Sequence, residues 1–319
     1  MKDYLIYLKR CFRQALIGSW VYYTWMSLLM VVCLVGLHAY CRQIAHGLVV
    51  TDMTDQVSWG LYIANFSYIE GIGAAAVMLV IPVYLYKDEC LERVVLFAEI
   101  LAVVCIIMCL LFVTVDLGRP DRFWHLIPGI GKFHFPISML TWDVVVLNGY
   151  LLLMVWISGY TIYCVYRDQK PTPLFYLPVT FISIGWAVSM LAATSFLYVG
   201  LGGRPFWNSA IVAARFQASA FAAGPALIII SLEFARIFAP KGVTLGVNRI
   251  ALNRLRSLIQ VSMIINMFLL LCEIFKEFYT DSLHTDAIRY LMFGLEGHSK
   301  LVPWFWSSMF LQVGARRRA

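Results

Sequence analysis

The sequence predicts an all-α protein that crosses a membrane about eight times, and three observations carry that prediction. Of its 319 residues, 61% are hydrophobic. Only 13% are charged, whereas a soluble domain carries about 25%. The apolar residues form continuous runs rather than alternating ones, and several runs reach the roughly 20 residues that a helix needs to cross hydrocarbon. This pattern excludes an ordinary soluble enzyme, a disordered chain and a disulfide-stapled secreted module.

Eight apolar runs are long enough, or nearly so, to be transmembrane helices. The first is too long for the apolar core of a signal peptide and lacks a small-residue cleavage site, so we count it as a span. The last is several residues short, which fits either a tilted helix or a chain cut off relative to longer relatives. We expect a single polytopic membrane domain, residues 1–319, forming two four-helix bundles. Its spans lie near residues 17–37, 59–84, 91–115, 137–163, 176–199, 209–238, 257–275 and 301–313.

Glycine and proline mark where several spans end. Pro82 indicates a kink or the end of the second span. The third span is followed by Gly118-Arg119-Pro120 and the fifth by Gly203-Arg204-Pro205, and a tryptophan follows each triplet. Such residues stop a helix and anchor it at the membrane interface. The repeated phrase reflects either this common way of ending a span or a weak internal duplication.

Lysine and arginine divide unequally between the two sets of loops that these spans create. Sixteen lie on the side of the two termini, and eight lie in the opposite loops. Because basic loops stay in the cytoplasm, we expect both termini there. The net charge of +7 is thus mainly a topology signal, and we expect no binding to nucleic acid.

Residues that could hold a redox metal are few and scattered. All six histidines fall at or beyond the outer ends of spans, whereas a membrane haem needs imidazoles that face one another inside the bundle. The eight cysteines include no Cys-x-x-Cys pair. Cys105 and Cys109 lie one helical turn apart, but two thiols do not hold a cluster. We therefore expect no haem, no iron–sulfur cluster and no other metal in this chain.

A few polar residues lie inside the spans, where burial is costly and usually linked to function. Asn65, Asp143 and Arg215 each lie six residues from the outer start of a span, about 9 Å deep at the helical rise. Glu70 and Asn148 lie eleven residues in, at about 16 Å. These two layers predict a pocket in the outer leaflet with a polar route below it. The alternative is that the groups only join helices, with Asp143 and Arg215 as a buried ion pair.

Three segments resemble one family of membrane proteins. They are WGLYIANFSYIEGIGAAAVML (Trp59–Leu79), DLGRPDRFWHL (Asp116–Leu126) and SMLTWDVVVLNGYLLL (Ser138–Leu153). These segments resemble the NrfD/polysulfide-reductase membrane-subunit family and, within it, most closely the P subunit of the DsrMKJOP complex of sulfur-metabolising prokaryotes. The resemblance is strong over residues 57–153 and weaker beyond, while span number and topology agree throughout.

The resemblance implies a multi-pass subunit of the prokaryotic cytoplasmic (inner) membrane that has no redox cofactor of its own and binds menaquinone or another quinone near the outer face. It would exchange electrons there with an iron–sulfur, ferredoxin-like subunit. A multihaem cytochrome c and further membrane and cytoplasmic redox subunits would complete a complex of sulfur metabolism and anaerobic respiration. The chain would be the quinone-reactive part of this oxidoreductase and would not be active alone.

Eight residues make up the candidate site. Asn65, Glu70 and Asp143 are carried over from the family motifs by position, and His38 and Arg215 are added for their depth and chemistry. Asp143 or His38 would exchange protons, and Arg215 would keep Asp143 ionised or stabilise negative charge on the ring. The residues expected to bind the quinone, with the two aromatic ones as an apolar wall, are Trp59, Asn65, Phe66, Glu70 and Asn148.

Proton translocation would add a further function. Glu70, Glu99 and Glu233 would then relay protons from the cytoplasm, and electrons would leave over the outer surface made by residues 119–124 and 206–207. Two other classes remain open at this point. A secondary transporter or ion channel would also need polar groups near the midplane, and a purely structural membrane anchor would use them only to hold helices together.

Overall fold

The computed structural model describes residues 2–54, 57, 59–85, 92–201, 205–238, 249–280 and 285–315. Within these ranges the chain forms helices and no β-strand. The long helices are α2 (Trp20–His46), α3 (Leu61–Leu85), α4 (Glu92–Asp116), α5 (Met139–Tyr166), α6 (Pro173–Val199), α7 (Ile211–Phe238) and α8 (Arg249–Thr280). The shorter ones are α1 (Lys2–Leu16), α9 (Thr285–Phe293), α10 (Val302–Ala315) and the 3-10 helices η1 (Leu48–Thr51), η2 (Pro120–Leu126) and η3 (Pro205–Trp207).

The predicted fold class, an all-α integral membrane protein, is confirmed. Six of the described helices, α2 and α4 to α8, are long and apolar enough to cross a membrane. A helix lies in each of the eight expected ranges. The largest difference is at α8, which begins at Arg249 rather than near residue 257. Its first two turns carry arginines, which lower hydropathy but are good helix formers, so the helix extends beyond the apolar run.

Two described helices were not expected from the apolar runs. The nine-residue α9 is too short to be noticed by hydropathy. The other, α1, is strongly amphipathic and lies against the end of α5, where the ring of Tyr7 packs 5.3 Å from Tyr163 and 5.0 Å from Tyr166 between centroids. Arg10 donates a hydrogen bond to the Tyr166 hydroxyl at 2.8 Å. A helix with this alternation of apolar and basic residues is typical of the membrane interface.

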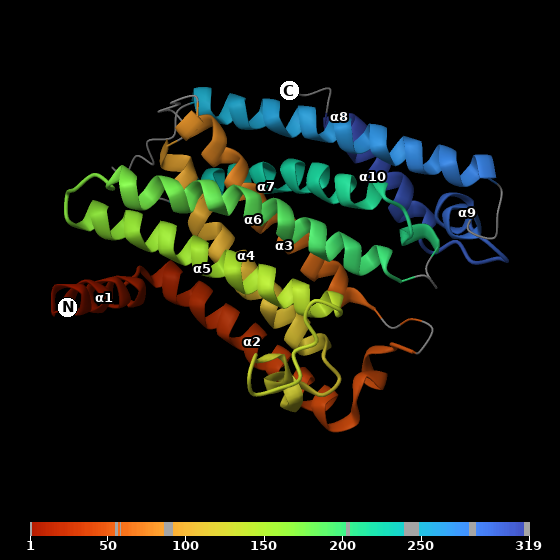
Figure 1. Ribbon diagram of the computed structural model, residues 1–319, viewed down its shortest axis with the longest axis horizontal. Helices are drawn as coiled ribbons and strands as arrows, with labels where there is room; N and C mark the ends of the chain where they lie inside the picture. The colour runs from red at the N-terminus through yellow and green to blue at the C-terminus, as the bar shows by residue number, and fades with distance from the viewer. Residues whose placement is uncertain are drawn as a thin grey trace.

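In place of the two four-helix bundles expected from the sequence, the described helices form one four-helix bundle with further helices packed on one side of it (Figure 1). Helices α3, α4, α5 and α6 contact one another in a ring, which is a four-helix bundle. On its outside α7 packs against α3 and α6, α8 packs against α7, and α10 contacts α8. Helix α3 therefore has neighbours on several sides, and its residues occupy the centre of the described structure.

Helix α2 runs along the edge of the bundle (Figure 1). None of the residues in its most apolar stretch is buried. It is attached near its end by Gln43, whose Nε2 donates to the carbonyl of Val115 at 2.7 Å and whose Oε1 accepts from the Tyr62 hydroxyl at 2.9 Å. This glutamine is 5% exposed, so one buried amide joins α2 to the ends of α3 and α4.

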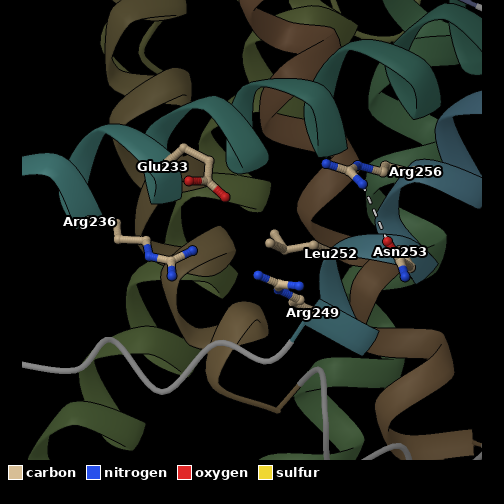
Figure 2. A pocket seen from close by; sticks show the side chains of 6 residues that line it. All are labelled: Glu233, Arg236, Arg249, Leu252, Asn253 and Arg256. Carbon is tan, nitrogen blue, oxygen red and sulfur yellow. Dashed lines mark hydrogen bonds between the residues drawn. The ribbon is translucent and has the colours of Figure 1, made fainter. Parts of the chain in front are cut away.

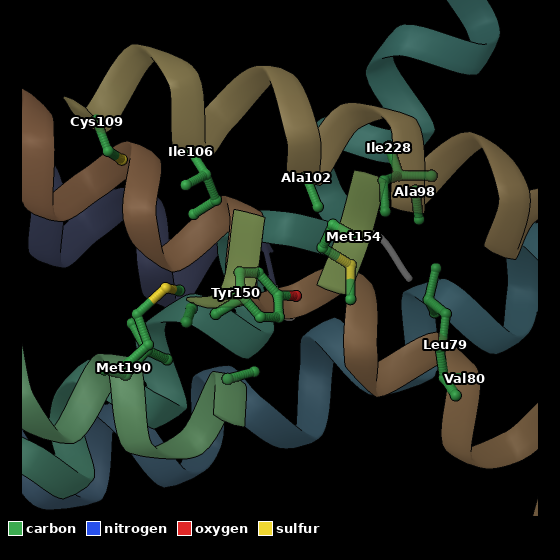
Figure 3. Packing of buried hydrophobic residues seen from close by; sticks show 14 of the residues in the cluster. Leu79, Val80, Ala98, Ala102, Ile106, Cys109, Tyr150, Met154, Met190 and Ile228 are labelled. Carbon is green, nitrogen blue, oxygen red and sulfur yellow. The ribbon is translucent and has the colours of Figure 1, made fainter. Parts of the chain in front are cut away.

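The core of the bundle is a tightly packed cluster of apolar side chains (Figure 3). At its centre the ring of Tyr150 on α5 is fully buried and lies among side chains such as Ile106, Met154 and Met190. Its hydroxyl donates to the carbonyl of Gly73 on α3 at 3.1 Å. A backbone carbonyl of the neighbouring helix thus satisfies this buried hydroxyl.

Small residues let α7 approach α3 closely. A Cβ added to Gly224 would lie 2.0 Å from the Cβ of Ala75, and one added to Gly71 would lie 3.3 Å from that of Ala220. Inside a membrane the hydrophobic effect does not drive helices together, because lipid is as apolar as the side chains. Close van der Waals contacts between small residues stabilise helix packing instead. The run of small residues within Trp59–Leu79 therefore serves helix packing beside the candidate site.

We expect the substitution Gly224→Ala to destabilise the protein by about 1–3 kcal/mol, because the new methyl group overpacks the contact between α7 and α3. Thermal unfolding in detergent would measure the loss. Gly185→Ala on α6 is the matched control, since a Cβ there meets nothing within 4 Å. It should leave stability unchanged or raise it slightly. Equal effects of the two substitutions would contradict the packing argument.

Candidate functional site

Two acidic side chains from different helices meet at one threonine. The Oγ1 atom of Thr194 on α6 lies 2.8 Å from Oε1 of Glu70 on α3 and 2.6 Å from Oδ1 of Asp143 on α5. Glu70 and Thr194 are fully buried, and Asp143 is 1% exposed. Burial of a charged group is costly unless it is paired and hydrogen-bonded. This cluster, Glu70–Thr194–Asp143, is therefore the most unusual chemical feature in the described bundle.

The hydrogen bonds of this cluster require at least one shared proton. A threonine hydroxyl carries one hydrogen and can donate it to only one of the two carboxyl groups. In the other contact the carboxyl group must be protonated, so that it donates to the hydroxyl oxygen. When the two hydrogen bonds reverse direction together, a proton moves from Glu70 to Asp143 or back. The cluster can therefore hold and transfer a proton inside the bundle.

Buried side chains enclose the cluster on the α3–α4 side. Phe66 lies one helical turn before Glu70 and is 1% exposed. The thiol of Cys109 on α4 is fully buried and lies 3.5 Å from the Phe66 carbonyl, within reach of a weak S–H hydrogen bond. The second carboxyl oxygen of Glu70, Oε2, has no hydrogen-bond partner in the described part of the chain. It is thus a buried polar atom that a ligand or a water molecule could satisfy.

Four aromatic rings, from α6, α7, η3 and the segment before α3, form a cluster one turn further along α6. The ring of Tyr198 packs 5.1 Å from Trp59, 5.1 Å from Trp207 and 5.5 Å from Phe216 between centroids. Tyr198 follows Thr194 by one helical turn, so both side chains lie on the same face of α6. The Tyr198 hydroxyl also lies 2.6 Å from the Ser67 hydroxyl of α3. The aromatic cluster therefore covers the buried carboxyl groups toward the loop end of the bundle.

A cavity of about 240 Å³ opens beside these residues, between α3, α6 and α7. Ser67 belongs both to the hydrogen bond with Tyr198 and to the cavity wall. The side chains around the cavity are mostly small or aromatic, and hydroxyl groups are its main polar atoms. The residues that line it are Ser67, Tyr68, Gly71, Leu191, Phe216, Ser219, Ala220 and Ala223.

The structure brings together only some of the residues predicted for the site. Glu70 and Asp143 meet through Thr194, with Phe66 beside them, and Trp59 lies in the aromatic cluster. The two asparagines instead bond to their own helices. Asn65 donates to the Leu61 carbonyl at 2.9 Å, and Asn148, which is exposed, donates to that of Val144 at 2.8 Å. These short-range bonds satisfy each amide without a neighbouring helix.

His38 lies on the exposed surface of α2. Its ring forms no hydrogen bond or ion pair with any residue that the structure describes. His38 was expected near the other residues because its depth was counted from the end of the helix alone. The edge position of α2 is a property of the packing, which hydropathy does not report.

Arg215 pairs with an acidic residue that the sequence reasoning did not consider. Its guanidinium donates to Glu273 of α8, whose side chain is 1% exposed. Asp143 has Thr194 as its partner, so the alternative ion pair between Asp143 and Arg215 is wrong, and so is the expectation that Arg215 keeps Asp143 ionised. Close by along α8, Lys276 pairs with the buried Glu277 at 3.1 Å. The pair of Arg215 with Glu273 joins α7 to α8.

The prediction of two separate polar layers is also corrected. Glu70 and Asp143 were assigned to different depths, yet both contact Thr194. Glu70 is the tenth residue of α3 and Asp143 the fifth of α5, a difference of about 7 Å of helical rise. Counting along the chain assumes that all helices begin at the same height. The helices of this bundle are staggered and tilted, and the two carboxyl groups therefore meet.

Sequence reasoning missed Thr194, Ser67, Tyr198 and Glu273. Thr194 and Ser67 carry hydroxyl groups inside apolar helices, where serine and threonine usually bond to their own backbone. A signal was present for Thr194, since it lies five residues before the last residue of α6, about as far from a helix end as Asp143 is from the start of α5. Glu273 lay within the expected span but near its end, where acidic residues are common. Among the described residues, no group of three or more histidine, cysteine or acidic side chains could hold a metal ion.

The fold and the buried cluster together define a class: a helical membrane protein with a buried pair of carboxyl groups beneath aromatic rings. Comparison with known proteins identifies the family. The family model described as "Polysulphide reductase, NrfD" matches residues 49–314, and the chain belongs to this family. The predicted family resemblance is thereby confirmed.

Three relatives show the range of proteins that this chain is similar to. It is 28% identical over 65% of its length to a putative dimethyl sulfoxide reductase membrane subunit of Halobacterium salinarum, covering 50% of that protein. It is 31% identical over 42% of its length to a selenate reductase subunit of Mesobacillus selenatarsenatis, covering 30% of that protein. It is 20% identical over 69% of its length to an Hdr-like menaquinol oxidoreductase integral membrane subunit of Archaeoglobus fulgidus, covering 52%. The chain spans about half or less of the length of these relatives.

Proposed function

We propose that this protein is the quinone-reactive membrane subunit of a respiratory redox complex in a prokaryotic cytoplasmic membrane. It would exchange electrons between menaquinone or menaquinol and an iron–sulfur, ferredoxin-like partner at the outer face. The observation that carries the proposal is the buried Glu70–Thr194–Asp143 cluster beneath the aromatic rings. Membership of a family of reductase membrane subunits supports it, as does the relative named for menaquinol.

The residues beside the cluster fit a quinone headgroup. The cavity of about 240 Å³ is below the roughly 300–1,000 Å³ of typical ligand pockets, which suits a ring whose lipid tail stays in the membrane. The ring of Phe216 and the apolar side chains that line the cavity would pack against the flat faces of the quinone ring. The hydroxyl groups of Ser67 and Ser219 would donate hydrogen bonds to the quinone oxygens. A bound quinone supplies chemistry of two electrons and two protons.

The chain's own contribution is to hold and deliver protons. Glu70 and Asp143 share a proton through Thr194 in a buried region. At least one of the two carboxyl groups therefore stays neutral, so that two negative charges are never buried side by side. The hydroxyls of Tyr198 and Ser67 form the next polar pair toward the cavity. Further inward, Glu99 accepts a hydrogen bond from the Tyr176 hydroxyl at 3.0 Å and is 1% exposed. In the proposed proton translocation, Glu99 would be the inner neighbour of the cluster.

The identity of the complex and of its other subunits is part of this proposal. A multihaem cytochrome c and further redox subunits would complete the complex, and a role in sulfur metabolism would follow from placement with the P subunits of DsrMKJOP-type complexes. The 20% identity to the menaquinol oxidoreductase subunit is modest support for that branch. The outer loop surface made by η2 and η3 would receive the iron–sulfur partner, because it presents exposed aromatic and arginine side chains such as Trp124 and Arg119.

Removal of the bridging hydroxyl tests the proposal. We expect Thr194→Val to lower quinol oxidation by the assembled complex about ten- to a hundredfold, the loss for a hydrogen bond to a charged group. Thr194→Ser keeps the hydroxyl and should retain most of the activity. Thr114→Val on α4 is the matched control, because that hydroxyl donates to the Leu110 carbonyl of its own helix, at 2.7 Å.

Unchanged quinol oxidation in Thr194→Val would contradict the proposal and favour a structural membrane anchor, in which the cluster only holds helices together. The transporter alternative predicts another result. In that case the isolated chain in liposomes would show ion-dependent flux that Thr194→Val abolishes, and quinone analogues would have no effect.

A further inference from the structure

A second pocket lies at the opposite end of the bundle from the aromatic cluster, where α7 ends and α8 begins. It has a volume of about 370 Å³ and is built by the last turns of α7 and the first turns of α8. Figure 2 shows Glu233 and Arg236 extending from α7 toward Arg249 and Leu252 of α8. The residues that line it are Glu233, Arg236, Arg249, Leu252, Asn253 and Arg256.

The pocket carries an excess of positive charge. Three guanidinium groups surround one carboxyl group. Arg256 donates to Oδ1 of Asn253 at 3.3 Å. Neither Arg236 nor Arg249 forms an ion pair or hydrogen bond with a side chain in the part of the chain that the structure describes. Guanidinium groups present paired donors that match the oxygens of a phosphate group, and the first backbone amides of a helix such as α8 add to this attraction.

The pocket lies beside apolar surface that would face lipid. On α7, Ile230 and Ile237 come three residues before and four residues after Glu233, so they occupy the neighbouring stripe of the helix. They are 63% and 74% exposed, and Ile250 at the start of α8 is 49% exposed. Leu252, which also lines the pocket, is 9% exposed. A charged pocket and an exposed apolar stripe thus meet within two helical turns.

We propose that this pocket binds the headgroup of an anionic phospholipid of the phosphatidylglycerol type. Arg236 and Arg249 hold the phosphate from α7 and α8, and Glu233 accepts a hydrogen bond from a headgroup hydroxyl. The acyl chains lie along Ile230 and Ile237. A basic pocket between helices at the membrane surface is suited to such a headgroup. The bound lipid would hold the two helices together at their connected ends, independently of any quinone chemistry.

Lipid binding to the full chain purified in detergent tests this proposal. Native mass spectrometry would follow titration with phosphatidylglycerol and, separately, with phosphatidylcholine. We expect the wild type to prefer phosphatidylglycerol, and Arg236→Gln/Arg249→Gln to bind it at least about tenfold more weakly, the loss for one charge-assisted hydrogen bond. Arg236→Lys/Arg249→Lys keeps both charges and should keep most of the preference.

The matched control is Arg167→Gln/Lys170→Gln, which removes two charges from the α5–α6 connection at the same end of the bundle. It should bind phosphatidylglycerol like the wild type, and thermal unfolding without added lipid should be alike for both glutamine variants. An equal loss in the two double variants, or no preference over phosphatidylcholine, would overturn the proposal. So would displacement of the lipid by millimolar inorganic phosphate, which would show a site for a small free anion.

Discussion

Replacing Asp143 by asparagine is expected to lower quinol oxidation by the assembled complex about a hundredfold or more. Asparagine keeps the shape of the side chain and can still accept a hydrogen bond from Thr194 Oγ1, which lies 2.6 Å from the carboxyl oxygen. It cannot bind or release a proton, and general acid–base groups contribute about 10²–10⁴ to rates. The loss should therefore appear in turnover while the thermal unfolding temperature of the protein changes little.

The matched control for this prediction is Asp168→Asn, the same chemical change beyond the other end of α5. Asp168 has a φ of 51°, in the left-handed region, which asparagine adopts readily. Activity and stability should both be preserved there. Normal turnover in Asp143→Asn would remove Asp143 from the proposed mechanism.

The cluster also makes a prediction about a double substitution. Glu70→Gln should slow turnover, since Glu70 shares the same hydroxyl at 2.8 Å. If the two carboxyl groups work as one proton-exchanging unit, the variant with both substitutions loses no more activity than the more damaging single one, because residues that act as a unit are non-additive. Independent, multiplying losses would show two separate proton sites instead.

The second large effect is expected at Arg215. Replacing it by methionine leaves Glu273, 1% exposed, without its partner in α7. Breaking a buried ion pair by removing one partner costs about 3–5 kcal/mol. We expect Arg215→Met to lower the unfolding temperature strongly in detergent. Arg215→Met with Glu273→Leu should recover most of that loss, since replacing both charges by apolar groups is often neutral.

An exposed ion pair provides the control for Arg215. Arg119 and Asp121 lie 3.4 Å apart with side chains 69% and 64% exposed, and Arg119→Met should cost at most about 1 kcal/mol. The double variant at α7 and α8 also separates two roles. Recovered stability with lost quinol oxidation would assign Arg215 to the quinone site, and recovery of both would make it a residue that only joins helices. A small effect of Arg215→Met alone would contradict the buried-pair argument.

Part of the buried cluster could be predicted from the sequence, and the residues found in this way share a property. Glu70 and Asp143 were singled out because an acidic residue inside an apolar run is expensive wherever the helix faces. Asn148 and His38 were selected by depth along the chain and Asn65 by depth and by its position in a family motif, and the structure turns each of them away from that cluster. An amide or imidazole can be satisfied by its own helix or at the lipid edge, so its presence in a span says less about function.

The sequence alone determined that this is a helical membrane protein, where its apolar helices lie and that Glu70 and Asp143 are inside them, because hydrophobic burial and the cost of buried charge depend on residue type and spacing. Only the tertiary structure decided which groups meet. The stagger of α3 against α5 brings Glu70 and Asp143 to the hydroxyl of Thr194. The packing of α7 on α8 places Arg215 in an ion pair with Glu273. Contacts between helices depend on tilt, stagger and rotation, which residue spacing along one helix does not encode.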